Sequence, residues 1–324
     1  MQPSDIFRVW RAVLEGRRPF LSVELTRECP LRCPGCYAYE PGHLGGGAGR
    51  HNGPELRGQA LVQGVLDLLR RVRPVHLSIV GGEPLVRWRE LSDLLPLLRP
   101  LGVEVQLVTS AVLPVPAAWA GMSHLHLAVS VDGLPDEHDR RRAPATYQRV
   151  LENIAGHQAI IHCTITAPML ARGDYLEEFA RFWSARPEAR RLWFSLFTPQ
   201  NGARSEERLT PADRLHALQQ MQRVRERYPK VHLPSQAMEG FRNPPPSPRE
   251  CIFAAVTMCV AADLTTPVLP CPFGGTPVCS ECGCLGAAGM QGVGRMRLGR
   301  IIPLAQIFRL SQRIGRLGAQ VAAS

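Results

Sequence analysis

The placement of the cysteines is the strongest chemical signal in this sequence. Three of the ten cysteines fall within residues 29–36 and six within residues 251–284, which leaves only Cys163 apart. In a reducing compartment, tight groups of this kind usually bind metal or carry out redox chemistry rather than form disulfides. We therefore expect two separate metal or redox sites.

The first group consists of Cys29, Cys33 and Cys36, spaced Cys-x3-Cys-x2-Cys directly after a predicted strand. Four thiolates would close a cubane [4Fe–4S] cluster, whereas three leave one iron with an open position. A cluster needs such a position to bind and transform a small molecule. The alternative is a structural zinc site or a set of incidental thiols, but the spacing and the place after a strand favour the cluster.

This loop resembles the signature of the radical S-adenosylmethionine (SAM) superfamily, Cys-x3-Cys-x-aromatic-Cys. It departs from that signature at the aromatic position, which is Gly35 here; in the family the aromatic ring lies against the adenine, and Tyr37 is a candidate substitute. The resemblance implies a [4Fe–4S] cluster that chelates SAM through its amino and carboxylate groups. It also implies reductive cleavage of SAM to a 5′-deoxyadenosyl radical, with an electron donor such as a flavodoxin or ferredoxin.

Residues at the ends of later predicted strands extend the resemblance. The segment Gly-Gly-Glu-Pro at 81–84 looks like the family motif whose carbonyls and glutamate accept hydrogen bonds from the SAM ammonium group. The family also implies a ribose contact near Thr109, a donor at Ser130 and a partner for the SAM carboxylate at Arg142. A β-turn, a helix cap and a local ion pair are the plainer alternatives. The candidate SAM-binding residues are Gly81, Gly82, Glu83, Pro84, Thr109, Ser130 and Arg142.

Six predicted strands must position these residues. The strands are predicted over 20–26, 75–80, 103–109, 126–131, 160–166 and 192–198, and helices over 56–71, 89–99, 145–157, 174–185 and 211–228. Six β-then-α units in series predict an α/β fold with a parallel sheet, here a partial (β/α)6 barrel of the TIM type. Active-site residues of such folds lie at the carboxyl ends of strands. We expect Glu24, Thr109, Ser130, Thr164, Phe194 and Phe197 to frame the cavity.

The second cysteine group follows a proline-rich stretch at 243–248, where we place a domain boundary. A predicted hairpin over 256–262 and 267–269 separates Cys251 from Cys271, and Cys259 within it is expected to pack. This arrangement resembles the twitch or SPASM-type appendage and implies one auxiliary [4Fe–4S] cluster, with structural zinc as the alternative. The candidate ligands are Cys251, Cys271, Cys279, Cys282 and Cys284.

Four parts are predicted along the chain. They are an N-terminal amphipathic helix over 1–17, a radical SAM partial barrel over 18–235, a Cys-rich auxiliary iron–sulfur domain over 249–290 and a basic C-terminal helical tail over 291–324. Glycine-rich stretches at 42–53 and 283–294 are predicted loops. Residues 295–317 contain six arginines and no acidic residue, with an apolar stripe at 304, 307, 310, 314 and 317. Two interpretations stay open: a helix docked on the barrel, which we favour, or peripheral contact with an anionic membrane.

Composition narrows the class of function. No apolar run approaches the length of a membrane span and no secretory signal is visible, so a cytoplasmic protein is expected. The net charge of +10 comes almost entirely from arginine and no nucleic-acid-binding motif accompanies it, so no nucleic-acid partner is expected. The family resemblance implies a peptide or a lipid as the substrate. A non-catalytic iron–sulfur or zinc-binding regulator is the alternative function.

Overall fold

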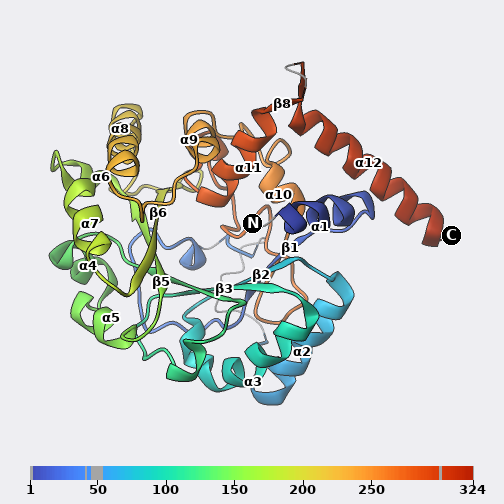
Figure 1. Cartoon of the computed structure of the whole chain (residues 1–324), viewed down its shortest axis with the longest axis horizontal. Coiled ribbons are helices and arrows are strands. Elements are labelled where there is room, and N and C mark those ends of the chain that lie inside the picture. Colours follow the sequence, from blue (N-terminus) through green and yellow to red (C-terminus); the bar gives the residue numbers. More distant parts are fainter. Residues whose placement is uncertain (1–2, 41, 45–53, 299–300, 324) are drawn as a thin grey trace.

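The computed structural model describes residues 3–40, 42–44, 54–298 and 301–323. Most of the predicted loop at 42–53 and the outermost residues of the first and last predicted parts lie outside the described residues. Figure 1 shows a curved sheet with helices outside it and the C-terminal elements gathered at one end. Among the described helices, none is both long enough and apolar enough to cross a membrane.

Seven parallel strands form the main sheet, in the order β6-β5-β4-β3-β2-β1-β7. The strands are β1 (Phe20–Glu24), β2 (His76–Val80), β3 (Glu104–Thr109), β4 (Leu125–Ser130), β5 (Ala159–Ile165), β6 (Ala189–Leu196) and β7 (Thr257–Val260). Because β6 and β7 are the two edges of this sheet, it does not close. The six predicted strands and the partial barrel are therefore confirmed, and β7 is an addition.

Helices connect consecutive strands and cover one face of the sheet. The helices of the barrel are α2 (Gly58–Val72), α3 (Trp88–Leu98), α4 (Pro135–Arg142), α5 (Tyr147–Asn153), α6 (Ala167–Leu170), α7 (Tyr175–Ser184) and α8 (Pro211–Arg227). Five more helices and a hairpin lie at the ends of the chain: α1 (Pro3–Leu14), α9 (Ser235–Arg242), α10 (Ile252–Val256), α11 (Leu285–Arg295), α12 (Leu304–Ala323), β8 (Arg297–Leu298) and β9 (Ile302–Pro303).

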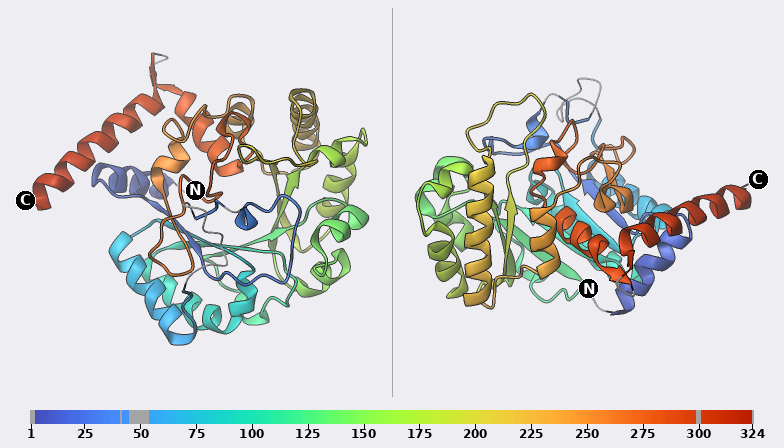
Figure 2. Two further views of the ribbon diagram at one scale, coloured as in Figure 1. Left: turned by 180° about the vertical axis from the view of Figure 1, so that it is seen from behind. Right: turned by 90° about the horizontal axis from the view of Figure 1, so that it is seen from above.

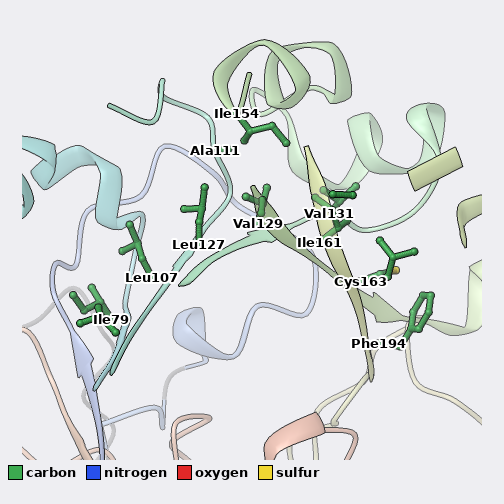
Figure 3. Close-up of a cluster of buried hydrophobic side chains, with 14 of the residues drawn as sticks. Ile79, Leu107, Ala111, Leu127, Val129, Val131, Ile154, Ile161, Cys163 and Phe194 are labelled. Carbon is green, nitrogen blue, oxygen red and sulfur yellow. The ribbon is translucent and has the colours of Figure 1, made fainter. Parts of the chain in front are cut away.

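The two faces of the sheet differ in polarity. On the outer face, Leu107, Val129 and Phe194 belong to the main hydrophobic core, as do residues of α2, α3, α5 and α7 (Figure 3). The inner face instead carries polar side chains such as Ser78, Gln106, His162 and Ser195. Parallel sheets are usually apolar on both faces. A polar inner face therefore suits contact with a ligand or solvent. Phe194 packs outward on Phe179, with ring centroids 5.8 Å apart, so its predicted place at the cavity is wrong.

Two features of the C-terminal segment differ from the sequence prediction. β7 belongs to the predicted auxiliary part but pairs with β1 of the barrel, so both parts share one sheet. The predicted loop at 283–294 is wrong, because this segment forms α11. A Cβ on Gly292 would lie 1.8 Å from the Gln236 carbonyl oxygen, and one on Gly240 would lie 1.8 Å from that of Ala288. These glycines let α9 and α11 pack backbone against backbone, and this tertiary contact outweighs their low helix propensity.

Candidate metal centres and the cavity between them

The Gly-Gly-Glu-Pro segment holds the base of the three-cysteine loop. The Gly82 amide donates to the Thr26 carbonyl at 2.8 Å, and the Glu83 amide donates to the Glu28 carbonyl at 2.8 Å. A Cβ on Gly82 would lie 1.9 Å from the Glu28 carbonyl oxygen, so no side chain fits there. The two glycines thus allow the end of β2 to lie directly against the chain that leads to Cys29.

Glu83 joins the ends of β2 and β3. Its carboxylate is buried and accepts four hydrogen bonds. The Leu85 amide (2.9 Å) and the Thr109 hydroxyl (2.5 Å) donate to Oε1, and the amide (2.7 Å) and hydroxyl (2.5 Å) of Ser110 donate to Oε2. Pro84 is buried and opens the short 3-10 helix that follows. Both oxygens of Glu83 therefore have protein donors, and the Thr109 hydroxyl hydrogen is directed to Glu83.

The three cysteines of the loop are free thiols of intermediate exposure. Cys29 and Cys33 pack against a small apolar cluster that includes Leu31. Burial raises the pKa of Cys33; among its neighbours, Arg142 lowers this pKa and Cys36 raises it. The Arg142 guanidinium group therefore lies near Cys33, where it favours the thiolate form of that cysteine.

Asp132 fixes this guanidinium group. The carboxylate is fully buried, and its Oδ2 accepts from the Nε atoms of Arg142 (2.7 Å) and Arg141 (2.8 Å), while the Thr164 amide donates to Oδ1 at 3.2 Å. Burial alone would raise the pKa of Asp132, but the two guanidinium groups hold it well below its usual range. Asp132 thus stays ionised and orients Arg142. Ser130, the last residue of β4, is partly buried.

The aromatic ring of Phe197, the residue after β6, occupies the space beside Gly35. A Cβ on Gly35 would lie 2.6 Å from Cε2 of Phe197 and 2.9 Å from Oε2 of Glu207, and the φ of Gly35 is +63°. The predicted substitute Tyr37 lies elsewhere, with its ring edge-on to Phe273 at a centroid distance of 5.1 Å. Phe197 is therefore the ring next to the position where the family signature has an aromatic residue.

His43 and Glu24 form a buried contact that the sequence analysis missed. His43 Nε2 lies 2.5 Å from Glu24 Oε1, and Nδ1 lies 3.0 Å from the Phe273 carbonyl oxygen. The other carboxylate oxygen, Glu24 Oε2, is buried and has no hydrogen-bond partner among the described residues. Glu24 was predicted at the cavity, but His43 lies in a glycine-rich segment, where the sequence offers no sign of burial.

The second cysteine group forms one electrostatically connected set. Burial raises the pKa of Cys282, and Cys284, Cys251 and Cys279 raise it further. Burial likewise raises the pKa of Cys271, and its neighbours include Cys284 and Cys282. Buried thiols of this kind become thiolates only beside a positive centre, which a bound metal supplies. These electrostatic neighbours link all five predicted candidates and also Cys259, which is a neighbour of Cys271.

Two of these cysteines accept hydrogen bonds from backbone amides. The Sγ atoms of Cys251 and Cys284 accept from the Ala254 and Ala287 amides at the starts of α10 and α11, at 3.5 Å each. Cys259, in contrast, is buried in β7 in a small apolar cluster, as predicted. The predicted hairpin around it is present, because the Val268 amide donates to the Cys259 carbonyl at 2.9 Å.

The Cys-rich segment is attached to the end of β6. The Leu196 amide donates to the Gly283 carbonyl at 2.9 Å, and the Gly283 amide donates to the Thr198 hydroxyl at 2.8 Å. Arg214 of α8 donates to the Cys282 carbonyl at 2.9 Å, a role that no sequence motif indicated. Because His43 joins the same segment to β1, the second cysteine group lies across the open side of the barrel.

The spacing of the thiols bears on the kind of metal site. Among the described residues, no three His, Cys, Asp or Glu side chains converge closely enough to hold a single ion. A structural zinc ion would need sulfur ligands at about 2.3 Å from one point. A four-iron cubane is a larger body in which each cysteine binds a different iron, so its ligands need not converge on one point.

Comparisons with known proteins agree with this geometry. The family model described as the Radical SAM superfamily matches residues 23–182. The chain is 33% identical over 129 residues to the 7-carboxy-7-deazaguanine synthase of Hyperthermus butylicus, covering 38% of this chain and 50% of that protein. It is 29% identical over 154 residues to the PqqA peptide cyclase of Rhodopseudomonas palustris, covering 43% of this chain and 38% of that protein. The chain thus spans half or less of these curated relatives.

Two solved structures resemble the fold. Streptococcus suis SuiB bound to precursor peptide SuiA superposes with a TM-score of 0.56 at 13% identity, covering 94% of this chain and 67% of that chain. Native anSMEcpe with bound AdoMet gives a TM-score of 0.56 at 16% identity, covering 88% of this chain and 84% of that chain. At this identity the likeness shows a common fold, and it extends into the Cys-rich segment.

Proposed function

This chain belongs to the radical SAM superfamily, and we propose that it uses a [4Fe–4S] cluster and SAM to modify a peptide. When bound, the cluster supplies one electron to SAM, whose cleavage yields methionine and a 5′-deoxyadenosyl radical that abstracts hydrogen from the substrate. Cys29, Cys33 and Cys36 are the proposed ligands. The main support for this proposal is that the chain after β2 is hydrogen-bonded to the chain before the cysteine loop. The Gly82 amide donates to the Thr26 carbonyl oxygen at 2.8 Å.

Each predicted residue has a task that follows from its surroundings. Gly81 and Gly82 bring the backbone of β2 close to the cysteine loop, where carbonyl groups can accept from the SAM ammonium group. Arg142, oriented by Asp132, provides a positive charge for the SAM carboxylate beside the thiols. Ser130 ends β4 as a hydroxyl donor. The Thr109 hydroxyl donates to Glu83 Oε1 at 2.5 Å, so Thr109 acts on the SAM site indirectly, by positioning Glu83.

We assign the adenine contact to Phe197. Its ring occupies the space beside Gly35, from which Tyr37 is turned away toward Phe273. Phe197 is also almost fully buried, so its position is fixed before any ligand binds. A ring held in place in this way stacks on a base at little cost in conformational entropy.

A peptide is the substrate class that the cavity supports best. The inner face of the sheet carries hydroxyl, amide and imidazole groups, which suit the many donors and acceptors of a peptide backbone better than a lipid. Two of the similar proteins have names that include a peptide, since one is a PqqA peptide cyclase and another is bound to the precursor peptide SuiA, whereas the name 7-carboxy-7-deazaguanine synthase does not. An external one-electron donor, such as a flavodoxin or ferredoxin, completes the proposal.

The second cysteine group is proposed to hold one auxiliary [4Fe–4S] cluster. Reconstituted protein should then contain about eight irons per chain, and the C29A/C33A/C36A variant about four. A C251A/C282A variant should lose the other half. Four irons in the parent protein together with one zinc would instead identify the second group as a structural zinc site.

Removal of a single loop cysteine tests the catalytic proposal. Cys29→Ala, Cys33→Ala or Cys36→Ala should each abolish formation of 5′-deoxyadenosine from SAM under dithionite. Cys163→Ala is the matched control, because it removes a fully buried thiol that belongs to the hydrophobic core. An undiminished rate in any loop variant would contradict the proposal. An iron-loaded parent protein that forms no 5′-deoxyadenosine would favour the regulatory alternative.

A further inference from the structure

A basic pocket lies at the C-terminal end of α11. It has a volume of about 260 Å³ and is bordered by the end of α11, the β8–β9 hairpin and the start of α12. Arg295, Arg297 and Arg309 line it, together with Gln291 and Glu250. In the views of Figure 2 this region lies at the edge of the molecule, where α12 extends away from the body.

The charges of this pocket are not balanced by the protein. Within the described parts of the chain, no ion pair engages Arg295, Arg297 or Arg309. The single acid, Glu250, accepts a hydrogen bond from the Ser247 hydroxyl at 3.3 Å. Three exposed guanidinium groups around one pocket favour a ligand with several anionic oxygens, because each can form two parallel hydrogen bonds to a phosphate.

Apolar side chains are exposed next to this pocket. In and beside the β8–β9 hairpin, the exposed fraction is 61% for Leu298, 75% for Ile301 and 46% for Ile302. Large apolar residues are rarely left in water in a contiguous group unless a partner covers them. The hairpin therefore joins an anion-binding pocket to an apolar edge.

The exposed apolar surface extends from the hairpin onto α12. The helix docks on α1, with the Phe308 and Trp10 rings 5.7 Å apart and with Gly315 so close to α1 that a Cβ would lie 2.4 Å from the Val13 carbonyl oxygen. This docking leaves the C-terminal members of the apolar stripe exposed. The exposed fraction is 58% for Leu310, 54% for Ile314 and 63% for Leu317. The tail is thus docked on α1, and these three residues of its stripe remain in water.

We propose that this surface binds an anionic phospholipid bilayer, with a lipid phosphate in the Arg295–Arg297–Arg309 pocket. The hairpin and the exposed stripe of α12 would enter the boundary between headgroups and acyl chains, as amphipathic interfacial helices do. Charge complementarity supports this occupant, because residues 295–317 contain six arginines and no acid.

Other occupants suit the surface less well. A two-fold dimer would bring this patch against its own copy and place arginines opposite arginines. An acidic peptide would satisfy the arginines but leave the apolar stripe in water. A bilayer satisfies both parts of the surface at once, and this is why we commit to it.

Vesicle binding by the full-length, reconstituted protein tests the proposal. Vesicles of phosphatidylglycerol and phosphatidylcholine should bind the protein, and pure phosphatidylcholine should bind it weakly. R295Q/R297Q/R309Q should weaken binding by about 100-fold, since each basic residue at an anionic surface contributes about fivefold. The matched control R190Q/R191Q/R223Q removes the same charge from exposed arginines on β6 and α8 and should change binding by only a few-fold. L310S/I314S, which keeps every arginine, should weaken binding by about tenfold or more.

Several results would overturn the inference. One is a parent protein that does not float with phosphatidylglycerol vesicles; another is a pocket variant that binds them as the parent does. Competition by millimolar glycerol phosphate would indicate a soluble anion instead. Binding to an acidic peptide but not to vesicles would indicate a protein partner. A dimer in light scattering that L310S/I314S converts to a monomer would indicate a second copy.

Discussion

The imidazole of His43 and the carboxylate of Glu24 meet at 2.5 Å in a buried contact where the barrel joins the Cys-rich segment. The same imidazole lies 3.0 Å from the Phe273 carbonyl oxygen, and the Gly275 amide donates to the His43 carbonyl at 3.3 Å. His43 thus connects the end of β1 with the segment that follows Cys271.

His43→Ala should destabilise the protein strongly. The variant leaves both Glu24 carboxylate oxygens buried without a described partner, and removal of one member of a buried pair costs about 3–5 kcal/mol. Urea unfolding under anaerobic conditions measures this cost. The double variant H43A/E24Q also replaces the carboxyl group that has lost its partner, so it should be more stable than H43A alone. A double variant as unstable as H43A or more so would show that the unpartnered Glu24 carboxyl group is not the source of the loss.

Gly82→Ala should prevent the three-cysteine loop from holding iron. The added Cβ would lie 1.9 Å from the Glu28 carbonyl oxygen, so the loop must move away from β2. Gly173→Ala is the matched control, because a Cβ there meets nothing within 4 Å. Iron content after reconstitution should fall by about half in the first variant, one cubane of two, and stay unchanged in the control. Full iron content in G82A would show that the cysteine loop can hold iron without this close contact to the end of β2.

Much of the barrel follows from local patterns in the sequence. Strands such as β3 and β5 have side chains that alternate between the core and the cavity, and helices such as α7 have a single apolar face, so their bounds are predicted within a few residues. The cysteine spacing and the Gly-Gly-Glu-Pro segment are also local. They predict which residues meet at the strand ends, and the structure brings these together.

The elements that sequence reasoning missed depend on distant contacts. α11 is rich in glycine and forms a helix only because α9 packs against its backbone, where a Cβ on Gly292 would meet Gln236. The pairing of β7 with β1 joins residues more than 200 positions apart. His43 is buried through contacts with Glu24 and Phe273, neither of which is near it in sequence. No local pattern carries such information.

His162 should make the protein less stable in mild acid. Burial lowers its pKa to about 4, and its Nε2 lies 2.8 Å from the Ser195 hydroxyl. Between pH 6.5 and 4 the unfolded chain binds a proton at this histidine and the folded chain does not, so acidification favours unfolding by about 1.4 kcal/mol per pH unit. His162→Gln keeps a donor for Ser195 and removes this proton. The loss of unfolding free energy between pH 7 and 5 should shrink by about 2 kcal/mol in urea titrations. An unchanged loss would mean that His162 does not titrate in this way.

Phe197→Ala should weaken SAM binding without removing the iron. The ring of Phe197 lies where a side chain on Gly35 would be. Phe197 has no atom that could bind iron, so its removal should leave the iron content unchanged. An aromatic contact contributes about 0.5–1.5 kcal/mol beyond the area it buries, so the dissociation constant of SAM should rise about 3- to 10-fold. Equilibrium dialysis of anaerobic protein without reductant measures this, because SAM is then bound but not cleaved. Phe197→Tyr keeps the ring and should bind SAM as the parent does. If Phe197→Ala binds SAM normally and Tyr37→Leu does not, the adenine contact comes from the cysteine loop and the assignment to Phe197 is wrong.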